Sequence, residues 1–114
     1  MPSDRARDAL LDIRENILLA QGFLGNLTPE GFAADTRTRY AVMRCLEIIS
    51  EASRRVAADI RDRHPGIPWS RIAAAGNVYR HEYKSIRDDL VLDTVHRALP
   101  RLLEAVEVEL SRLA

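Results

Sequence analysis

Apolar residues recur at spacings of three and four along most of the chain, which is the period of an amphipathic α-helix. In the first quarter this spacing is carried by Ala6, Leu10, Ile13, Ile17, Ala20 and Leu24. The pattern ends near Gly25-Asn26 and therefore predicts one long helix before that point. Thr28-Pro29-Glu30 then places a capping residue before a proline suited to a first helical turn, which predicts a short helix through Phe32.

A second long helix is predicted from Asp35 or Thr36 to the stop signal His64-Pro65-Gly66. Its apolar face is formed by Val42, Cys45, Leu46, Ile49, Val56 and Ile60. A third helix is expected from Ser70 to about Tyr79.

A last helix is expected to begin between Asp88 and Asp93 and to run towards the C-terminus. Pro100 falls inside it and should kink it, because proline lacks a backbone N–H. No stretch alternates apolar and polar residues long enough to indicate a strand. The pattern therefore predicts an all-α fold, an antiparallel bundle of four main helices plus a short extra helix, as a single domain over residues 1–114.

The charge balance restricts how the chain could bind nucleic acid. Lysine and arginine together number 17, as do aspartate and glutamate, so the formal net charge is zero. Attraction to RNA through bulk charge is therefore absent, and only a local patch could provide it. Such a patch lies between Arg71 and Arg87, where four basic residues accompany one acidic residue, Glu82.

Composition also indicates the compartment. The single cysteine, Cys45, cannot form an intrachain disulfide, and the longest stretch without charge is 14 residues, short of the roughly 20 apolar residues of a membrane span. The first residues lack the basic-then-apolar order of a signal peptide. We therefore expect a cytoplasmic protein that does not enter a membrane.

Motifs for cofactor or metal binding are absent from the sequence. There is no glycine-rich phosphate loop, and His81-Glu82 fails as a helical zinc signature because Ser85 stands where the second histidine would be. We therefore expect neither a metal nor a cofactor.

The segment Gly76–Tyr83 gathers an imidazole, an amide, a guanidinium and two phenols within eight residues. A histidine such as His81 can act as general acid or base on a ribose hydroxyl or a leaving oxygen, and the adjacent Arg80 can hold the phosphate. The alternative is that Arg80, His81 and Lys84 only line a solvated helix end, where cations are favoured by the helix dipole.

Four blocks in order along the chain resemble the HepT-type toxins of the HEPN class, which are the helical ribonuclease partners in HepT–MNT toxin–antitoxin pairs. The blocks are Asp35 with Arg39–Val42 and Arg44–Ala52, then Pro65–Trp69, then Asn77 with His81–Tyr83, and last Leu99-Pro100. The resemblance covers nearly the whole chain and implies a helical, HEPN-like fold.

The family signature is Arg-Asn, three variable residues, His, one variable residue, Tyr. Asn77, His81 and Tyr83 match it, whereas Gly76 stands at the arginine position. The resemblance implies a metal-independent endoribonuclease that acts on RNA, with its site composite across a homodimer. Arg80, or Arg71 about one and a half turns before Gly76, could substitute for the missing guanidinium.

Tyr83 carries a second implication of the resemblance. In similar proteins the MNT-type nucleotidyltransferase antitoxin transfers AMP from ATP onto this tyrosine, which would place a phosphodiester beside His81 and block RNA. The other interpretation of Tyr83 is a half-buried aromatic that packs at the helix end.

An acidic residue on the second long helix resembles one that orients the arginine of the family. Glu47 and Glu51 are four residues apart and share a helix face, and Glu51 is the candidate for this role, with solvation at the surface as the alternative.

Two main hypotheses follow. In the first, the chain is a toxin ribonuclease in which His81 is the acid or base, Asn77 positions the phosphate and Arg80 compensates for Gly76. In the second, it is a catalytically impaired module that binds or regulates a nucleotidyltransferase, with Gly76 marking the lost activity. A weaker third hypothesis is a helical nucleotide-binding module related only by fold.

Overall fold

The computed structural model describes residues 2–114, and side chains from Asp4 onward. These residues form helices joined by short turns and contain no strand. The elements are α1 (Pro2–Leu24), α2 (Pro29–Ala34), α3 (Thr36–Ser53), α4 (Ala58–Arg63), α5 (Trp69–His81), α6 (Asp88–Asp93), the π-helical segment η1 (Thr94–Ala98) and α7 (Leu99–Leu113). None of the described helices is long and apolar enough to span a membrane.

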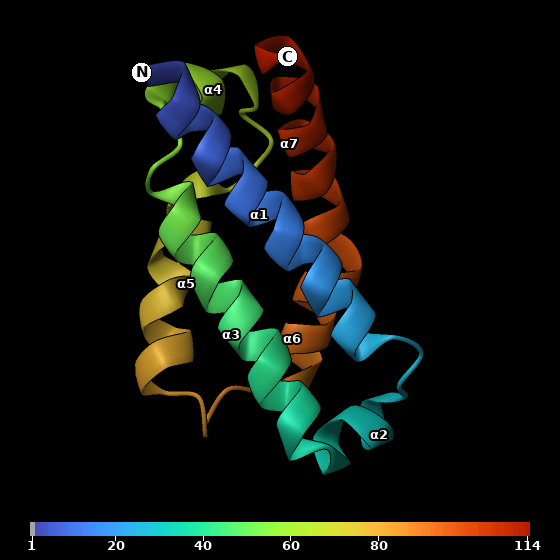
Figure 1. Ribbon diagram of the computed structural model, residues 1–114. Coiled ribbons are helices and arrows are strands. Elements are labelled where there is room, and N and C mark those ends of the chain that lie inside the picture. The colour runs from blue at the N-terminus through green and yellow to red at the C-terminus, as the bar shows by residue number, and fades with distance from the viewer. Residues whose placement is uncertain (1) are drawn as a thin grey trace.

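The long helices alternate in direction, so each packs antiparallel to its neighbours (Figure 1). Helix α1 lies between α3 and α7, and α3 lies between α1 and α5. The predicted all-α bundle of four main helices is confirmed, with α6, η1 and α7 together forming the fourth. Helix α5, which carries the histidine segment, lies at the edge of the bundle and packs chiefly on α3.

The predicted apolar faces form the core. On α1 the buried members are Leu10, Ile13, Ile17, Ala20 and Leu24, and on α3 they are Val42, Cys45, Leu46 and Ile49. Burial of each large aliphatic side chain contributes about 1.5–3 kcal/mol, so these two faces supply much of the driving force for folding.

Two predicted caps hold the connection between α1 and α3. Thr28 Oγ1 accepts a hydrogen bond from the Gly31 amide at 3.0 Å, and Asp35 Oδ1 accepts one from the Thr38 amide at 3.0 Å. The bond from the Thr38 backbone also lowers the pKa of Asp35. These side chains replace backbone partners that a helix start lacks, which explains why both helices begin where the sequence predicts.

The second long helix, α3, is shorter than predicted. It ends at Ser53, because the Ser53 hydroxyl donates to the Ser50 carbonyl at 2.6 Å and takes the acceptor that the Arg54 amide would use. The Arg54 amide bonds the Glu51 carbonyl instead, and the chain tightens into a turn before α4. Val56 and Ile60 remain buried beyond this break, so the apolar pattern gave no sign of it.

Pro100 disturbs the last helix as predicted, but the disturbance lies before it. Without an N–H, Pro100 cannot bond the His96 carbonyl, and the turn ahead of it widens into η1, in which the Leu99 amide donates to the Thr94 carbonyl.

A buried carboxylate ties the end of α4 and the loop that follows it to α7. The Glu109 carboxylate, whose side chain is 2% exposed, accepts hydrogen bonds from Arg63 Nη2 at 2.5 Å and from His64 Nε2 at 2.7 Å. The Arg63 hydrogen bond, with a smaller contribution from His64, lowers the pKa of Glu109 to about 2. Because Trp69 Nε1 donates to the His64 carbonyl at 3.0 Å, the cluster also fixes the first residue of α5.

Candidate functional site

The seam between α3 and α5 is defined by three cross-helix contacts, Ser50 with Gly76, Glu47 with Arg80 and Tyr40 with Tyr83. The residue numbers fall on α3 as they rise on α5, as antiparallel packing requires. The seam therefore leads from a buried contact in mid-helix to exposed side chains at the end of α5.

Gly76 occupies the closed part of the seam. It is buried, and its amide donates to Ser50 Oγ at 2.9 Å, while the same hydroxyl donates to the Ala73 carbonyl at 3.0 Å. A Cβ at position 76 would lie 2.6 Å from Ser50 Oγ and 3.1 Å from Ser50 Cβ. Position 76 therefore has no room for a side chain unless Ser50 gives way, and an arginine, which the resemblance leads us to expect there, would meet the same obstacle.

Arg80 lies one helical turn after Gly76 and also faces α3. Its Nε donates to Glu47 Oε2 at 2.8 Å, and Glu47 Oε1 accepts from Arg44 Nη1 at 2.7 Å. These hydrogen bonds, that of Arg80 first, lower the pKa of Glu47, and the bond with Glu47 raises the pKa of Arg80. One ionised carboxylate thus orients two guanidinium groups, one of which belongs to the residue directly before His81.

Asn77 and His81 are both exposed and are four residues apart on α5, so they share a face of the helix next to the seam. Within the described residues neither side chain hydrogen bonds another protein group. The imidazole and the amide are therefore open to a substrate.

Tyr83 lies in the turn after α5, where its ring meets Tyr40 of α3. The ring centroids are 5.6 Å apart and the rings are perpendicular. Tyr83 is 37% exposed and Tyr40 is 46% exposed, so both rings remain accessible from solvent.

The two supporting candidates from the sequence lie outside these contacts. Glu51 is exposed, and its charge contributes least to the raised pKa of Arg80. The carboxylate that binds Arg80 is Glu47, one turn earlier. Arg71 is exposed, and five residues turn an α-helix by about 140°, which places Arg71 on a different side of α5 from Gly76.

Sequence reasoning did not assign roles to Glu47, Arg44 and Tyr40. Together with Met43, Tyr79, Arg80 and Tyr83 they line an open hollow of about 250 Å³. The register of α3 against α5 is the signal that identifies them, because pairing Ser50 with Gly76 places Glu47 opposite Arg80.

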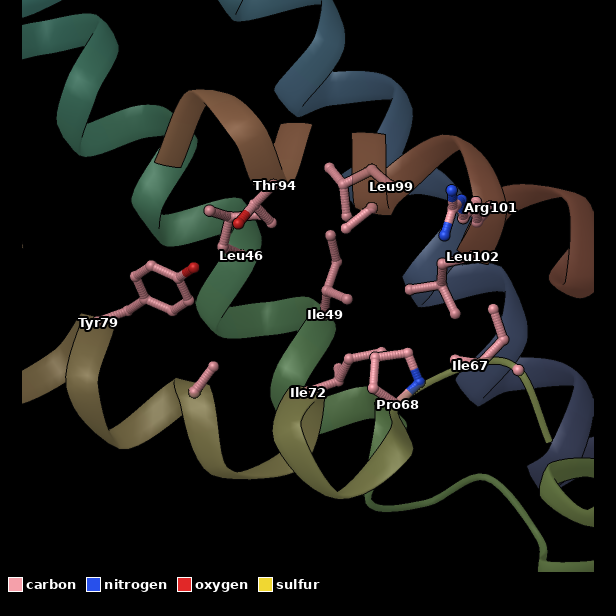
Figure 2. A pocket seen from close by; sticks show the side chains of 13 residues that line it. Leu46, Ile49, Ile67, Pro68, Ile72, Tyr79, Thr94, Leu99, Arg101 and Leu102 are labelled. Atoms are coloured by element: carbon pink, nitrogen blue, oxygen red, sulfur yellow. The ribbon is translucent and has the colours of Figure 1, made fainter. Parts of the chain in front are cut away.

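A second pocket, of about 170 Å³, lies on the other side of Tyr79 between α3, α5 and the last helix (Figure 2). Its labelled lining is mostly aliphatic, with Leu46, Ile49 and Ile72 around its middle. Burial raises the pKa of Tyr79, and a hydrogen bond with Thr94 partly opposes this. The pocket offers no ionised acid or histidine, and among the described side chains no group of three or more potential ligands could hold a metal ion.

The arrangement at the end of α5 suits phosphodiester chemistry. It combines an open imidazole, an open amide and an oriented guanidinium, which can move protons, position a phosphate and offset its developing charge. A backbone dipole that ends at the same point favours the positive charges.

Comparison with known proteins agrees with this chemistry. The profile of the family described as "Ribonuclease HepT-like" matches residues 13–109. A protein of Thermococcus cleftensis named "Probable ribonuclease HepT" is 36% identical over 96 residues, which cover 84% of this chain and 87% of that protein.

Two proteins of Methanocaldococcus jannaschii, each named "Putative RNase", are also similar. One is 31% identical over 107 residues, covering 94% of this chain and 88% of the relative, and the other is 33% identical over 99 residues, covering 87% and 91%. No solved structure matches the chain significantly. The family match over most of the chain confirms the resemblance, and the chain belongs to the HepT-like ribonuclease family.

Proposed function

We propose that this chain is a metal-independent endoribonuclease that cleaves RNA and serves as the toxin of a HepT–MNT type toxin–antitoxin pair. The observation that carries the proposal is the fixed guanidinium of Arg80, held by Glu47 at 2.8 Å directly before the open His81. Family membership supports the substrate class.

In the proposed reaction an RNA 2′-oxygen attacks the adjacent phosphorus while the bond from phosphorus to the 5′-oxygen breaks. The imidazole of His81 takes the proton of the 2′-hydroxyl, and a protonated His81, from the second copy in a homodimeric site, gives one to the leaving oxygen. Asn77 donates to a phosphate oxygen, and Arg80 offsets the charge that grows on the phosphate.

The test is RNA cleavage by purified protein, with His81→Ala compared with His96→Ala. His96 is the matched control because it is an exposed histidine on η1, outside the seam. We expect His81→Ala to lose roughly 100-fold or more of the activity at an unchanged melting temperature, and His96→Ala to retain it. Equal cleavage by both variants would refute the role of His81.

Tyr83 is the proposed control point of this toxin. A nucleotidyltransferase antitoxin would transfer AMP to its hydroxyl, releasing pyrophosphate from ATP, and the added phosphodiester would occupy the position of an RNA phosphate. Intact-mass measurement after incubation with an MNT-type nucleotidyltransferase and ATP should show added AMP. Tyr83→Phe should prevent the addition, whereas Tyr40→Phe, which removes the hydroxyl of the contacting ring, should not.

A second candidate function is a catalytically impaired module that binds and regulates a nucleotidyltransferase. The packing of Gly76 against Ser50 favours this alternative, because it leaves no room for the arginine that the resemblance places at position 76. Under this alternative the purified homodimer would bind the nucleotidyltransferase but leave total RNA intact.

A further inference from the structure

The open hollow at the end of the seam contains side chains on α3 to which the proposed reaction gives no role. Its floor and sides come from Tyr40, Met43 and Arg44 of α3, facing Arg80 and Tyr83. Tyr40 and Tyr83 meet edge to face, so Tyr40 keeps at least one ring face that Tyr83 does not cover. A flat, accessible aromatic face is a stacking surface for a nucleobase.

The charges in the hollow complement a phosphate. Glu47 divides its carboxylate between Arg44 and Arg80, so the three groups carry a net charge of +1. Arg44 is 66% exposed and spends a single N–H on Glu47 among the described contacts, which leaves further donors for a phosphate oxygen. The shared carboxylate holds both guanidinium groups in place before any ligand arrives.

The spacing of Tyr40 and Arg44 on α3 suits a base and the neighbouring phosphate of one RNA strand. Tyr40 and Arg44 are four residues apart on α3, so they project side by side. Arg80 completes the other edge of the hollow and leads to His81 on α5. A strand anchored here would therefore continue towards the proposed catalytic histidine.

We propose that this hollow is a subsite for one nucleotide of single-stranded RNA, in which the base stacks on Tyr40 and Arg44 holds the adjacent phosphate. The inference rests on the proposed function, since it assigns part of the same substrate. A base paired within a duplex cannot present its face to Tyr40, which restricts the ligand to unpaired RNA.

The test measures binding of a short, fluorescently labelled 2′-O-methyl RNA strand, which lacks the hydroxyl needed for cleavage. Fluorescence anisotropy would be recorded for the full chain over a range of salt concentrations. Tyr40→Ala should weaken binding roughly tenfold, whereas Tyr40→Phe keeps the ring and should stay within about twofold. Should Tyr40→Ala lower the melting temperature, Tyr40→Leu removes the flat ring and keeps apolar bulk.

Arg44→Gln should also weaken binding, and should lower the slope of log affinity against log salt by about 0.7, the value for one lost contact to single-stranded phosphate. Arg97→Gln is the matched control, because Arg97 is exposed, forms an ion pair with Asp93 within its own segment and lines no part of the hollow. It should leave affinity and slope unchanged.

Unchanged affinity in Tyr40→Ala and Arg44→Gln would overturn the subsite. Cleavage of ordinary RNA by the unmutated chain, measured in parallel, separates this result from failure of the proposed function. If the chain cleaves RNA but these variants bind normally, only the subsite is wrong. If the unmutated chain neither binds nor cleaves RNA, both proposals fail.

Two competing ligands test whether the hollow binds a nucleotide within a single strand, a free nucleotide or a duplex. Adenosine 5′-monophosphate should compete far more weakly than the strand, and a duplex of the same sequence should not compete through Tyr40. Equal competition by the free nucleotide would assign the hollow to a small molecule and overturn the RNA subsite.

Discussion

Two carboxylates in this molecule each gather basic side chains around them, and they serve different ends. Glu109 binds Arg63 and His64 at the junction of the α4–α5 loop with α7 and lies 3.5 Å from Arg112, and its side chain is 2% exposed. Glu47 binds Arg44 and Arg80 across the seam, where the two guanidinium groups are 66% and 51% exposed. The first cluster shields its acid almost completely from solvent, whereas the acid of the second is 13% exposed and its two guanidinium groups keep their remaining donors in solvent.

The difference separates a cluster that stabilises the fold from one whose free donors suit the RNA subsite that we propose. Water screens the exposed pairs of Glu47, so they contribute little to folding, yet their free donors can meet a ligand. The buried Glu109 has no such use, but loss of its partners would leave a charge without solvent. The exposure of a carboxylate and its basic partners therefore decides whether their contacts stabilise the fold or leave donors for a ligand.

The largest expected effect comes from removing the buried acid. Glu109→Gln should lower the free energy of unfolding by about 3 kcal/mol, because Arg63, His64 and Arg112 lose the nearly buried charged acceptor that they share. Urea unfolding at neutral pH measures this, and Glu107→Gln is the control, since Glu107 is 51% exposed and lies 3.8 Å from Arg14. Equal loss in both variants would remove the distinction between the clusters.

The pH dependence of the free energy of unfolding tests the same contribution of Glu109. The pKa of Glu109 falls from its ordinary value of 4.5 to about 2 on folding, so its contribution is complete above pH 4.5 and is lost as the pH falls towards 2. The free energy of unfolding of the unmutated chain should fall by up to about 3 kcal/mol over that window from this group. In Glu109→Gln the curve should be flatter, and an equally steep curve would assign the acid sensitivity to other carboxylates.

An intermediate effect is expected at the closed part of the seam. Gly76→Arg places a Cβ against Ser50 Oγ and should cost about 1–3 kcal/mol of stability, as over-packing does. Ser50→Gly should relieve the overlap, so the double variant should be more stable than the sum of the single changes by about 1 kcal/mol. A double-mutant cycle from urea unfolding measures this coupling.

The same pair of variants bears on the missing arginine. If an arginine at position 76 adds to catalysis, RNA cleavage should rise in Ser50→Gly/Gly76→Arg above that of Ser50→Gly. If the double variant is as stable as Ser50→Gly and cleaves RNA at the same rate, Arg80 already supplies the guanidinium.

The smallest effect on stability is expected at the exposed cluster. Glu47→Gln should change the free energy of unfolding by less than about 1 kcal/mol, since its partners are solvated. RNA cleavage should nevertheless fall roughly tenfold, because Arg80 loses the acceptor that orients it. Glu51→Gln provides the comparison, and a greater loss of cleavage in that variant would restore the role that the sequence suggested for Glu51.

Most residues of the candidate site were named from the sequence because the signals for them are local, and their roles stay predictions. Asn77, His81 and Tyr83 match a spaced signature within one helix and its following turn, and Arg80 stands next to the histidine. The partner of Arg80 could not be chosen in this way, since Glu47 is 33 residues away and shares its helix face with Glu51. Only the offset between α3 and α5 decides between the two acids.

Local sequence is enough to account for the helical period, the buried faces of α1 and α3, and the caps Thr28 and Asp35, because each depends on residues within one or two turns. Tertiary structure decided the break after Ser53, the fit of Gly76 to Ser50 and the hollow beside Arg80. The break depends on the acceptor that the Ser53 hydroxyl takes, and the other two features depend on how α3 and α5 are offset along the seam. Such choices follow from packing the whole bundle, and the apolar pattern remains the same whichever choice is made.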